Sequence, residues 1–314
     1  MRAVEAYLQA DDGVGLFVRR FEPHSRDADR WLFLVHGMSE HGQCYEHVAR
    51  SAVARGWNVL IPDLRGHGRS GGEHIHVNNF SEYVSDLRRI WEWGGLSSRN
   101  TVMVGHSMGG LISARFVQEF PDCVSALALI SPLLRVRMRI SPFTIALGKL
   151  LSLVRPRSRF RKRTDPTHSS RNPDALSRGA ADPLIRNSLT AAWFFAMRAA
   201  LETAWELAEQ IACPLLVLQA GSDLIVDPHA PHAWLERVGS LDKTLRVLPD
   251  HYHELLNELD WANTLADMLD WLELRVLESS RAAARVLECS PAAARVLECS
   301  PAAANGLFPL RETA

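Results

Sequence analysis

One stretch constrains the fold more than any other: Val102-Met-Val-Gly-His-Ser-Met-Gly-Gly110. β-favouring residues from Thr101 to Val104 precede a Gly-x-Ser-x-Gly motif, and residues 111–117 follow with helical spacing. The pattern predicts a sharp strand-to-helix turn that presents Ser107 at a helix N-terminus, where the dipole favours developing negative charge. Gly105 and Gly109 are expected to leave room where a Cβ would collide with neighbouring backbone.

The rest of the chain alternates strands and helices around this turn. An N-terminal hairpin with an Asp-Gly turn is expected over residues 4–21. Further strands are expected at residues 31–35, 58–62, 101–104, 124–130, 214–218 and 244–248, with helices at about 45–55, 80–93, from 228 and at 254–274. Alternating strands and helices predict right-handed crossovers and a mostly parallel central sheet flanked by helices.

Two segments depart from the alternation. Residues 133–210 show helical pattern without a clear strand, which predicts an all-helical cap inserted after the sixth strand. We therefore expect a core of residues 1–132 and 211–274. Residues 275–314 repeat a ten-residue unit, and Pro291 and Pro301 would interrupt a helix, so we expect a dispensable low-complexity tail. An alternative is a dimerising tail linked through Cys289 and Cys299.

Composition excludes several classes of function. The 314 residues are 47% hydrophobic with a net charge of −1, which gives no global field for nucleic acid. The five cysteines are scattered and odd in number, so we expect a reducing compartment. The N-terminus lacks the apolar core of a signal peptide and no apolar run is long enough to span a bilayer. We expect a cytoplasmic protein, with a peripheral position at the inner membrane face as the alternative. Its oligomeric state is not indicated.

A serine nucleophile needs a base, an orienting acid and donors for the oxyanion. Asp223 follows the strand that resumes after the cap, and it is the expected acid; Asp227, which resembles a helix N-cap before Pro228, is the alternative. His253 follows the last strand, and we expect it to open the final helix and act as the base. His251 is the alternative base. The backbone N–H groups of Met38 and Met108 are the expected oxyanion donors.

The remaining histidines are expected to make structural or orienting hydrogen bonds. Gly37 and His106 adjoin the expected donors, and we expect them to contact the substrate. His74-x-His76 and His251-x-His253 have metal-ligand spacing, but no nearby carboxylates or cysteines complete a site, so no metal or other cofactor is expected.

Five ordered motifs resemble the monoacylglycerol lipase and lysophospholipase branch of the α/β-hydrolases. They are His36-Gly-Met-Ser-Glu-His-Gly-Gln-Cys-Tyr45, Asp63-Leu-Arg-Gly-His-Gly-Arg-Ser70, Gly105-His-Ser-Met-Gly109, Gly221-Ser-Asp223 and Tyr252-His-Glu-Leu-Leu-Asn-Glu258. The resemblance spans about residues 4–274. It implies the α/β-hydrolase fold and hydrolysis of lipid monoesters, with Ser107, Asp223 and His253 as triad and Met38 and Met108 as oxyanion donors. The chain departs from the family pattern at Ser39, where glycine is usual, and at Cys44, where arginine is usual.

Other functions remain open from the sequence. A short-chain carboxylesterase, thioesterase, aminopeptidase or carbon–carbon bond hydrolase would share the same triad, and a binding protein could use the same scaffold. The cap also carries eleven Lys or Arg residues between Arg135 and Arg171 against one acid, Asp165, beside an apolar stretch at residues 140–154. This pattern predicts peripheral contact with anionic membranes. The alternative is a solvated basic face above an apolar underside that packs on the core.

Overall fold

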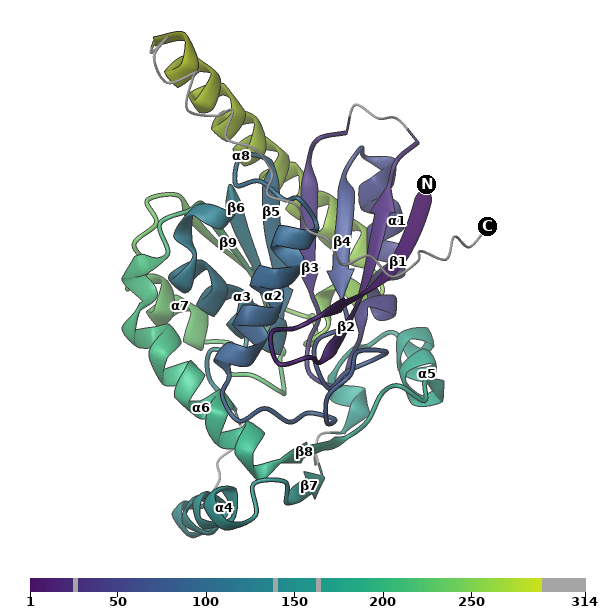
Figure 1. The fold of residues 1–314 in the computed structure, drawn as a ribbon, viewed down its shortest axis with the longest axis vertical. Coiled ribbons are helices and arrows are strands. Elements are labelled where there is room, and N and C mark those ends of the chain that lie inside the picture. Colours follow the sequence, from purple (N-terminus) through teal and green to yellow (C-terminus); the bar gives the residue numbers. More distant parts are fainter. Residues whose placement is uncertain (25–27, 138–140, 162–164, 290–314) are drawn as a thin grey trace.

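A central sheet of eight strands organises the molecule, in the order β1-β2-β4-β3-β5-β6-β9-β10 (Figure 1). The computed structural model describes residues 1–24, 28–137, 141–161 and 165–289. The strands are β1 (Arg2–Gln9), β2 (Gly15–Glu22), β3 (Trp31–Val35), β4 (Asn58–Pro62), β5 (Thr101–His106), β6 (Ala126–Ile130), β9 (Leu215–Ala220) and β10 (Lys243–Leu248). β2 pairs antiparallel with β1 and β4, and the other pairs are parallel, as predicted.

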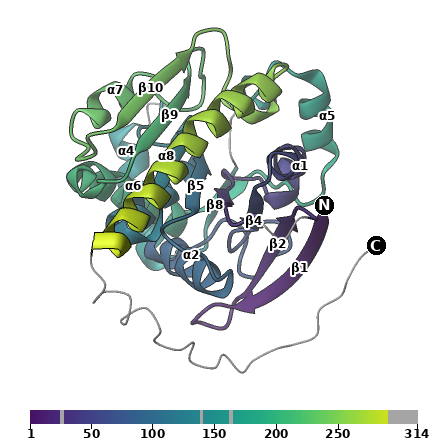
Figure 2. The same cartoon turned by 90° about the horizontal axis from the view of Figure 1, so that it is seen from above.

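Helices cover both faces of this sheet (Figure 2). On one face, α1 (Glu46–Ala54) and α8 (Trp261–Cys289) share an apolar core with the sheet. On the other face, α2 (Ser81–Trp93), α3 (Met108–Glu119) and α7 (Ala230–Leu235) share a second core. β3, β4, β5, β6 and β9 are buried along their whole length. Burial on both faces explains why these strands are continuous apolar runs rather than alternating ones.

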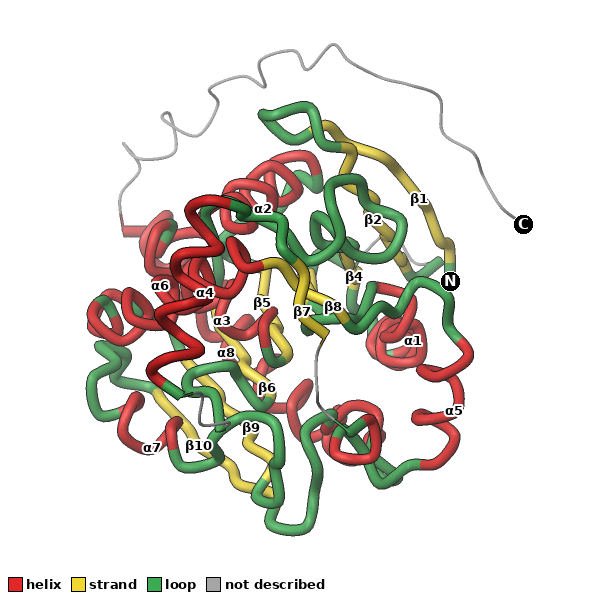
Figure 3. The backbone as a smooth tube through the Cα atoms, turned by 90° about the horizontal axis from the view of Figure 1, so that it is seen from below, coloured by secondary structure: helices red, strands yellow, loops and turns green. Residues whose placement is uncertain are grey.

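The cap lies between β6 and β9 in the sequence and covers one end of the sheet (Figures 1 and 3). Its elements are α4 (Pro142–Val154), β7 (Arg159–Arg161), α5 (Pro173–Ala181), β8 (Ser188–Thr190) and α6 (Ala191–Glu206). The prediction of an all-helical cap is wrong, because β7 and β8 pair as a small antiparallel sheet. Each has only three residues, which is too short to show an alternating pattern in the sequence.

Short 3₁₀ helices connect several of these elements. They are η1 (Gly42–Tyr45), η2 (Pro121–Cys123), η3 (Pro166–His168), η4 (Ala208–Gln210) and η5 (Leu255–Asn257). α7 begins at Ala230 rather than at Pro228, because the Asp227 side chain accepts the His229 N–H and closes a turn first. No helix in the described parts of the chain is long and apolar enough to cross a bilayer.

The last helix differs from its prediction at both ends. α8 begins at Trp261 and continues to Cys289, so it includes the first copy of the repeat, which was assigned to the tail. A buried face explains why the helix does not stop at residue 274: Leu265, Met268, Leu272 and Val276 recur at helical spacing and share the apolar core with the sheet. Beyond Val276, Leu277 and Glu278 are exposed. Pro291, Pro301 and Cys299 lie outside the described residues.

Candidate active site

The turn between β5 and α3 holds Ser107 in a strained backbone conformation, with φ of 52° and ψ of −115°. Left-handed φ is unfavourable for a residue with a Cβ, and such strain persists only where the surroundings enforce it. Two glycines allow this close packing. A Cβ on Gly109 would lie 2.3 Å from the Val35 carbonyl oxygen, and one on Gly105 would lie 2.5 Å from the Gly109 carbonyl oxygen. The predicted role of both glycines is confirmed.

A chain of hydrogen bonds joins the three expected side chains. His253 Nε2 lies 2.8 Å from Ser107 Oγ, and His253 Nδ1 lies 2.7 Å from Asp223 Oδ2. All three are nearly withdrawn from solvent, with exposed fractions of 8% for Ser107, 4% for His253 and 0% for Asp223. The structure therefore brings together residues that are 146 and 30 positions apart in the sequence.

Asp223 is prepared to remain a carboxylate. Its second oxygen, Oδ1, accepts hydrogen bonds from the backbone N–H groups of Ile225, at 2.8 Å, and Val226, at 2.9 Å. Burial alone would raise the pKa of Asp223, but the charge and hydrogen bond of His253, together with the two N–H groups, outweigh burial and lower it. An ionised Asp223 holds the imidazole with Nδ1 protonated, which leaves Nε2 free to accept a proton from Ser107.

The alternative acid and base have other partners. Asp227 forms an ion pair with Arg135 at 3.1 Å, and His251 Nε2 lies 2.8 Å from Asp260 Oδ1. The prediction that His253 opens the final helix is wrong. His253 lies in the loop before η5, because residues 255–260 form a 3₁₀ turn and a bend before α8 begins at Trp261.

The loop after β3 lies against the nucleophile. A Cβ on Gly37 would be 3.3 Å from the Ser107 Cβ, so the backbone that precedes Met38 passes directly beside the serine. Met108 is the first residue of α3, and the first N–H groups of a helix have no intrahelical acceptor. Both expected donors thus adjoin Ser107. Ser39, where the family usually has glycine, adopts a left-handed φ of 67°.

Glu40 and Tyr45 form a buried network that residue-by-residue reasoning missed. Glu40 Oε2 accepts hydrogen bonds from the Gly37 N–H at 2.7 Å and from the Tyr45 hydroxyl at 2.8 Å, and it lies 3.3 Å from His106 Nδ1. His106 Nε2 in turn lies 3.3 Å from the His253 carbonyl oxygen. The network connects the oxyanion loop with the base. The sequence did carry one indication of this network, namely the acidic residue Glu40 within the motif from His36 to His41.

Charge stabilises this network although it is buried. Burial would lower the pKa of His106, but the facing Glu40 carboxylate outweighs burial and raises it. For Glu40, burial would raise the pKa, and the charge and hydrogen bond of His106 lower it instead. His106 is only 4% exposed and its ring nitrogens face Glu40 and His253. These contacts favour an orienting role for His106, while contact of His106 or Gly37 with a substrate stays a prediction.

The other motif histidines make structural hydrogen bonds. His36 Nε2 accepts the Leu64 N–H at 2.9 Å, and His67 Nδ1 lies 3.0 Å from the Arg65 carbonyl oxygen. His76 Nδ1 lies 2.9 Å from Thr190 Oγ1 in the cap. Within the described ranges, no three histidine, cysteine or acidic side chains gather in a way that could hold a metal ion.

Comparison with known proteins identifies the family. A family model described as serine aminopeptidase, S33, matches residues 26–260. The chain belongs to this family. A monoacylglycerol lipase of Mycolicibacterium smegmatis is 31% identical to this hydrolase over 247 residues, which are 77% of this chain and 87% of the relative. Lysophospholipase L2 of Escherichia coli is 31% identical over 294 residues, covering 83% of this chain and 84% of the relative.

The solved structures agree with the sequence relatives. The monoacylglycerol lipase of Paleococcus ferrophilus matches this hydrolase with a TM-score of 0.76 and 29% identity, covering 83% of this chain and 99% of that chain. The α/β-hydrolase fold and the resemblance to the monoacylglycerol lipase and lysophospholipase branch are therefore confirmed. The protein is a serine ester hydrolase.

Proposed function

We propose that this hydrolase cleaves carboxylic esters of single-chain lipids, of the monoacylglycerol and lysophospholipid type, through an acyl-enzyme on Ser107. The observation that carries the proposal is the hydrogen-bonded series from Asp223 through His253 to Ser107. The relatives named monoacylglycerol lipase and lysophospholipase support the class of substrate. The backbone N–H groups of Met38 and Met108 are the proposed oxyanion donors.

The reaction follows from this geometry. His253 Nε2 accepts the Ser107 proton as Oγ attacks the ester carbonyl carbon, and the resulting oxyanion is held by the two backbone N–H groups. When the intermediate collapses, the bond to the alcohol oxygen breaks and His253 returns the proton to the leaving glycerol or glycerophosphate ester. A water molecule then repeats the sequence on the acyl-enzyme and releases the fatty acid. Asp223 stabilises the imidazolium in both halves.

A panel of substrates tests the proposal. Purified enzyme is given monoacylglycerols, lysophospholipids, short-chain p-nitrophenyl esters and amino-acid amides at equal concentrations, and release of acid is measured. We expect hydrolysis of the single-chain lipid esters with kcat/KM well above that of the amides. Ser107→Ala should lower kcat by several orders of magnitude, since loss of a nucleophilic serine removes covalent catalysis. Preference for amides, or lipid hydrolysis that survives Ser107→Ala, would overturn the proposal.

We further propose that the cap makes peripheral contact with anionic membranes through α4. No residue of α4 is buried, and its apolar side chains Phe143, Leu150 and Leu153 are 78%, 56% and 75% exposed. Lys149 and Arg155 lie on or beside the same helix. Apolar side chains can enter the headgroup region while basic ones meet anionic lipids, each basic residue adding about 1 kcal/mol.

Ion pairs of the cap arginines determine which residues can be changed in a test of membrane binding. Arg157 and Arg159 both pair with Glu73, outside the cap, at 3.1 and 3.3 Å, so replacing them would also remove contacts between the cap and the rest of the molecule. The test is therefore co-sedimentation with phosphatidylglycerol vesicles for Phe143→Ser combined with Leu153→Ser. We expect binding by the wild type that weakens with salt and is lost in this double variant. Equal, negligible binding to anionic and neutral vesicles would contradict membrane contact.

A further inference from the structure

A groove between the cap and the core lies apart from the nucleophile. Its volume is about 460 Å³, and it is bounded by α6, the end of α4, the start of α2 and the outer half of α3. Arg115, which lines it, is eight residues beyond Ser107 on α3, or about 12 Å at the rise of an α-helix. The groove is therefore separate from the acyl-transfer centre, and its volume falls within the usual range for small-molecule sites.

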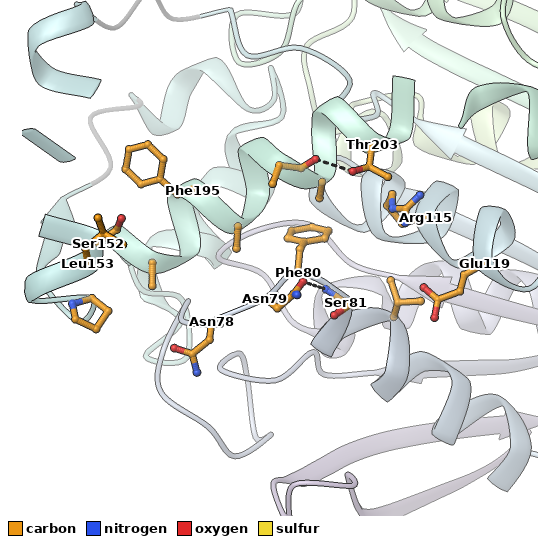
Figure 4. A pocket seen from close by; sticks show the side chains of 16 residues that line it. Asn78, Asn79, Phe80, Ser81, Arg115, Glu119, Ser152, Leu153, Phe195 and Thr203 are labelled. Atoms are coloured by element: carbon orange, nitrogen blue, oxygen red, sulfur yellow. Dashed lines mark hydrogen bonds between the residues drawn. The ribbon is translucent and has the colours of Figure 1, made fainter. Parts of the chain in front are cut away.

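The groove is elongated and polar at one end. Figure 4 shows Arg115, Glu119 and Thr203 at one end and Leu153 and Phe195 at the other. Between these ends, α6 contributes small apolar side chains, Ala192, Ala196, Ala199 and Ala200. The core side contributes the ring of Phe80 beside the polar residues Asn78, Asn79 and Ser81. From Ala192 to Thr203, the helix covers eleven residue steps, or about 16 Å. This length, along the alanine-lined face of α6, suits one extended hydrocarbon chain.

The polar end presents a cation without an anionic partner. Arg115 Nη1 donates to the Gln118 side-chain oxygen at 2.6 Å, and no carboxylate in the described ranges forms an ion pair with it. Glu119 lies one turn further along α3 but is exposed to solvent. Burial lowers the pKa of Arg115, with the Glu119 charge only partly opposing that effect. A half-buried guanidinium is best stabilised by an oxyanion that accepts two parallel hydrogen bonds.

We propose that this groove is a second binding site, occupied by a fatty acid whose carboxylate meets Arg115 and whose chain lies along the alanines of α6 toward Leu153. The choice of a fatty acid rests on the proposed function, because that reaction releases one. The far end supports it: Leu153 is 75% exposed and lies on α4 with the exposed Phe143 and Leu150, so a chain can enter from this apolar surface of the cap.

Equilibrium dialysis of laurate against the full chain tests this site. The protein is first treated with dodecyl fluorophosphonate, which occupies Ser107 and its acyl site. We expect one laurate to remain bound per chain, and Arg115→Gln to weaken its binding by about tenfold or more, because a charge-assisted hydrogen bond is lost. Arg115→Lys keeps the charge but loses the planar pair of N–H donors, so it should weaken binding less than Arg115→Gln does. Arg198→Gln, on another face of α6, removes the same charge and is the matched control.

Two further probes identify the ligand. Dodecanol has the chain without the charge, so its binding should be the same in Arg115→Gln and wild type, whereas Ala199→Phe should block both ligands. Absence of bound laurate after treatment, or equal affinity in Arg115→Gln and Arg198→Gln, would overturn the site. Tighter binding of dodecyl phosphate than of laurate would overturn the assignment to a fatty acid. These readouts do not depend on turnover, so an enzyme inactive on lipid esters would refute the proposed function without deciding the groove.

Discussion

At the scale of single residues, the site depends on which of two similar side chains is buried. Asp223 is fully buried and accepts two backbone N–H bonds as well as the His253 ring, while Asp227 is paired with Arg135. We expect Asp223→Asn to lower kcat by about 10⁴, because an amide favours the wrong imidazole tautomer. Asp227→Asn is the matched control and should stay within a few-fold of wild type. Steady-state kinetics measure kcat of both variants. A larger loss of kcat in Asp227→Asn than in Asp223→Asn would exclude Asp223 as the acid.

Ser39 is a second informative residue. It adopts a left-handed φ of 67°, and its buried hydroxyl has no hydrogen-bond partner among the residues that the structure describes. Ser39→Gly removes both the steric penalty and the unpaired hydroxyl, so we expect the free energy of unfolding to increase by about 1 kcal/mol. The greater freedom of glycine in the unfolded chain opposes this gain and reduces it. Urea denaturation measures the change. A loss of stability would contradict the expectation that relief of the left-handed φ and of the unpaired hydroxyl outweighs the freedom of glycine.

At the scale of elements, packing of α3 against β3 holds the nucleophile turn. A Cβ on Gly109 would lie 2.3 Å from the Val35 carbonyl oxygen, and neither backbone can yield without separating the two elements. We expect Gly109→Ala to destabilise the fold by several kcal/mol, or to displace Ser107 and abolish activity. Gly148→Ala is the control, because α4 is helical there and a Cβ would be in ordinary contact, 3.4 Å from Phe195. Helix propensity predicts a gain of about 0.5–1 kcal/mol for it. Thermal unfolding and activity are measured for both variants. A loss in Gly109→Ala alone would show a steric clash at that position rather than a general effect of replacing glycine by alanine.

At the scale of the whole molecule, buried neutral histidines couple stability to pH. Burial lowers the pKa of His36 to about 4 and that of His67 to about 3, from an ordinary value of 6.5. Between pH 6.5 and about 4, the unfolded chain binds protons at these positions and the folded chain does not, so stability falls as the pH falls through this window.

The expected loss is on the order of 3 kcal/mol for each histidine if the full window is crossed. The measurement is the urea midpoint from pH 7 to pH 4.5. His67→Gln should make the midpoint less steeply dependent on pH, whatever its effect at pH 7. An unchanged slope in this variant would show that His67 is not a source of the acid sensitivity.

The sequence by itself determined the succession of strands along the chain, the strand-to-helix turn around Ser107, and which acid and histidine to propose beside it. Apolar runs mark strands that are buried on both faces, and glycines mark turns that a Cβ would block, so both are readable locally. Asp223 and His253 could be chosen because each lies in the loop after a strand, and parallel strands place their carboxyl ends at one edge of the sheet.

Only the tertiary structure decided the features that depend on distant partners. β7 and β8 exist because they pair with each other across the cap, and α8 extends past residue 274 because Val276 packs on the sheet. Glu40 stands in a motif that the sequence does mark, but its role follows from contacts with Gly37, Tyr45 and His106 that only the structure shows. Arg115, which forms no ion pair within the described ranges, likewise lines a groove only because α3 and α6 are assembled side by side. A local sequence pattern reflects the conformational preference of its own residues. These roles depend instead on contacts with residues that are distant in the sequence, and only the folded chain brings those residues together.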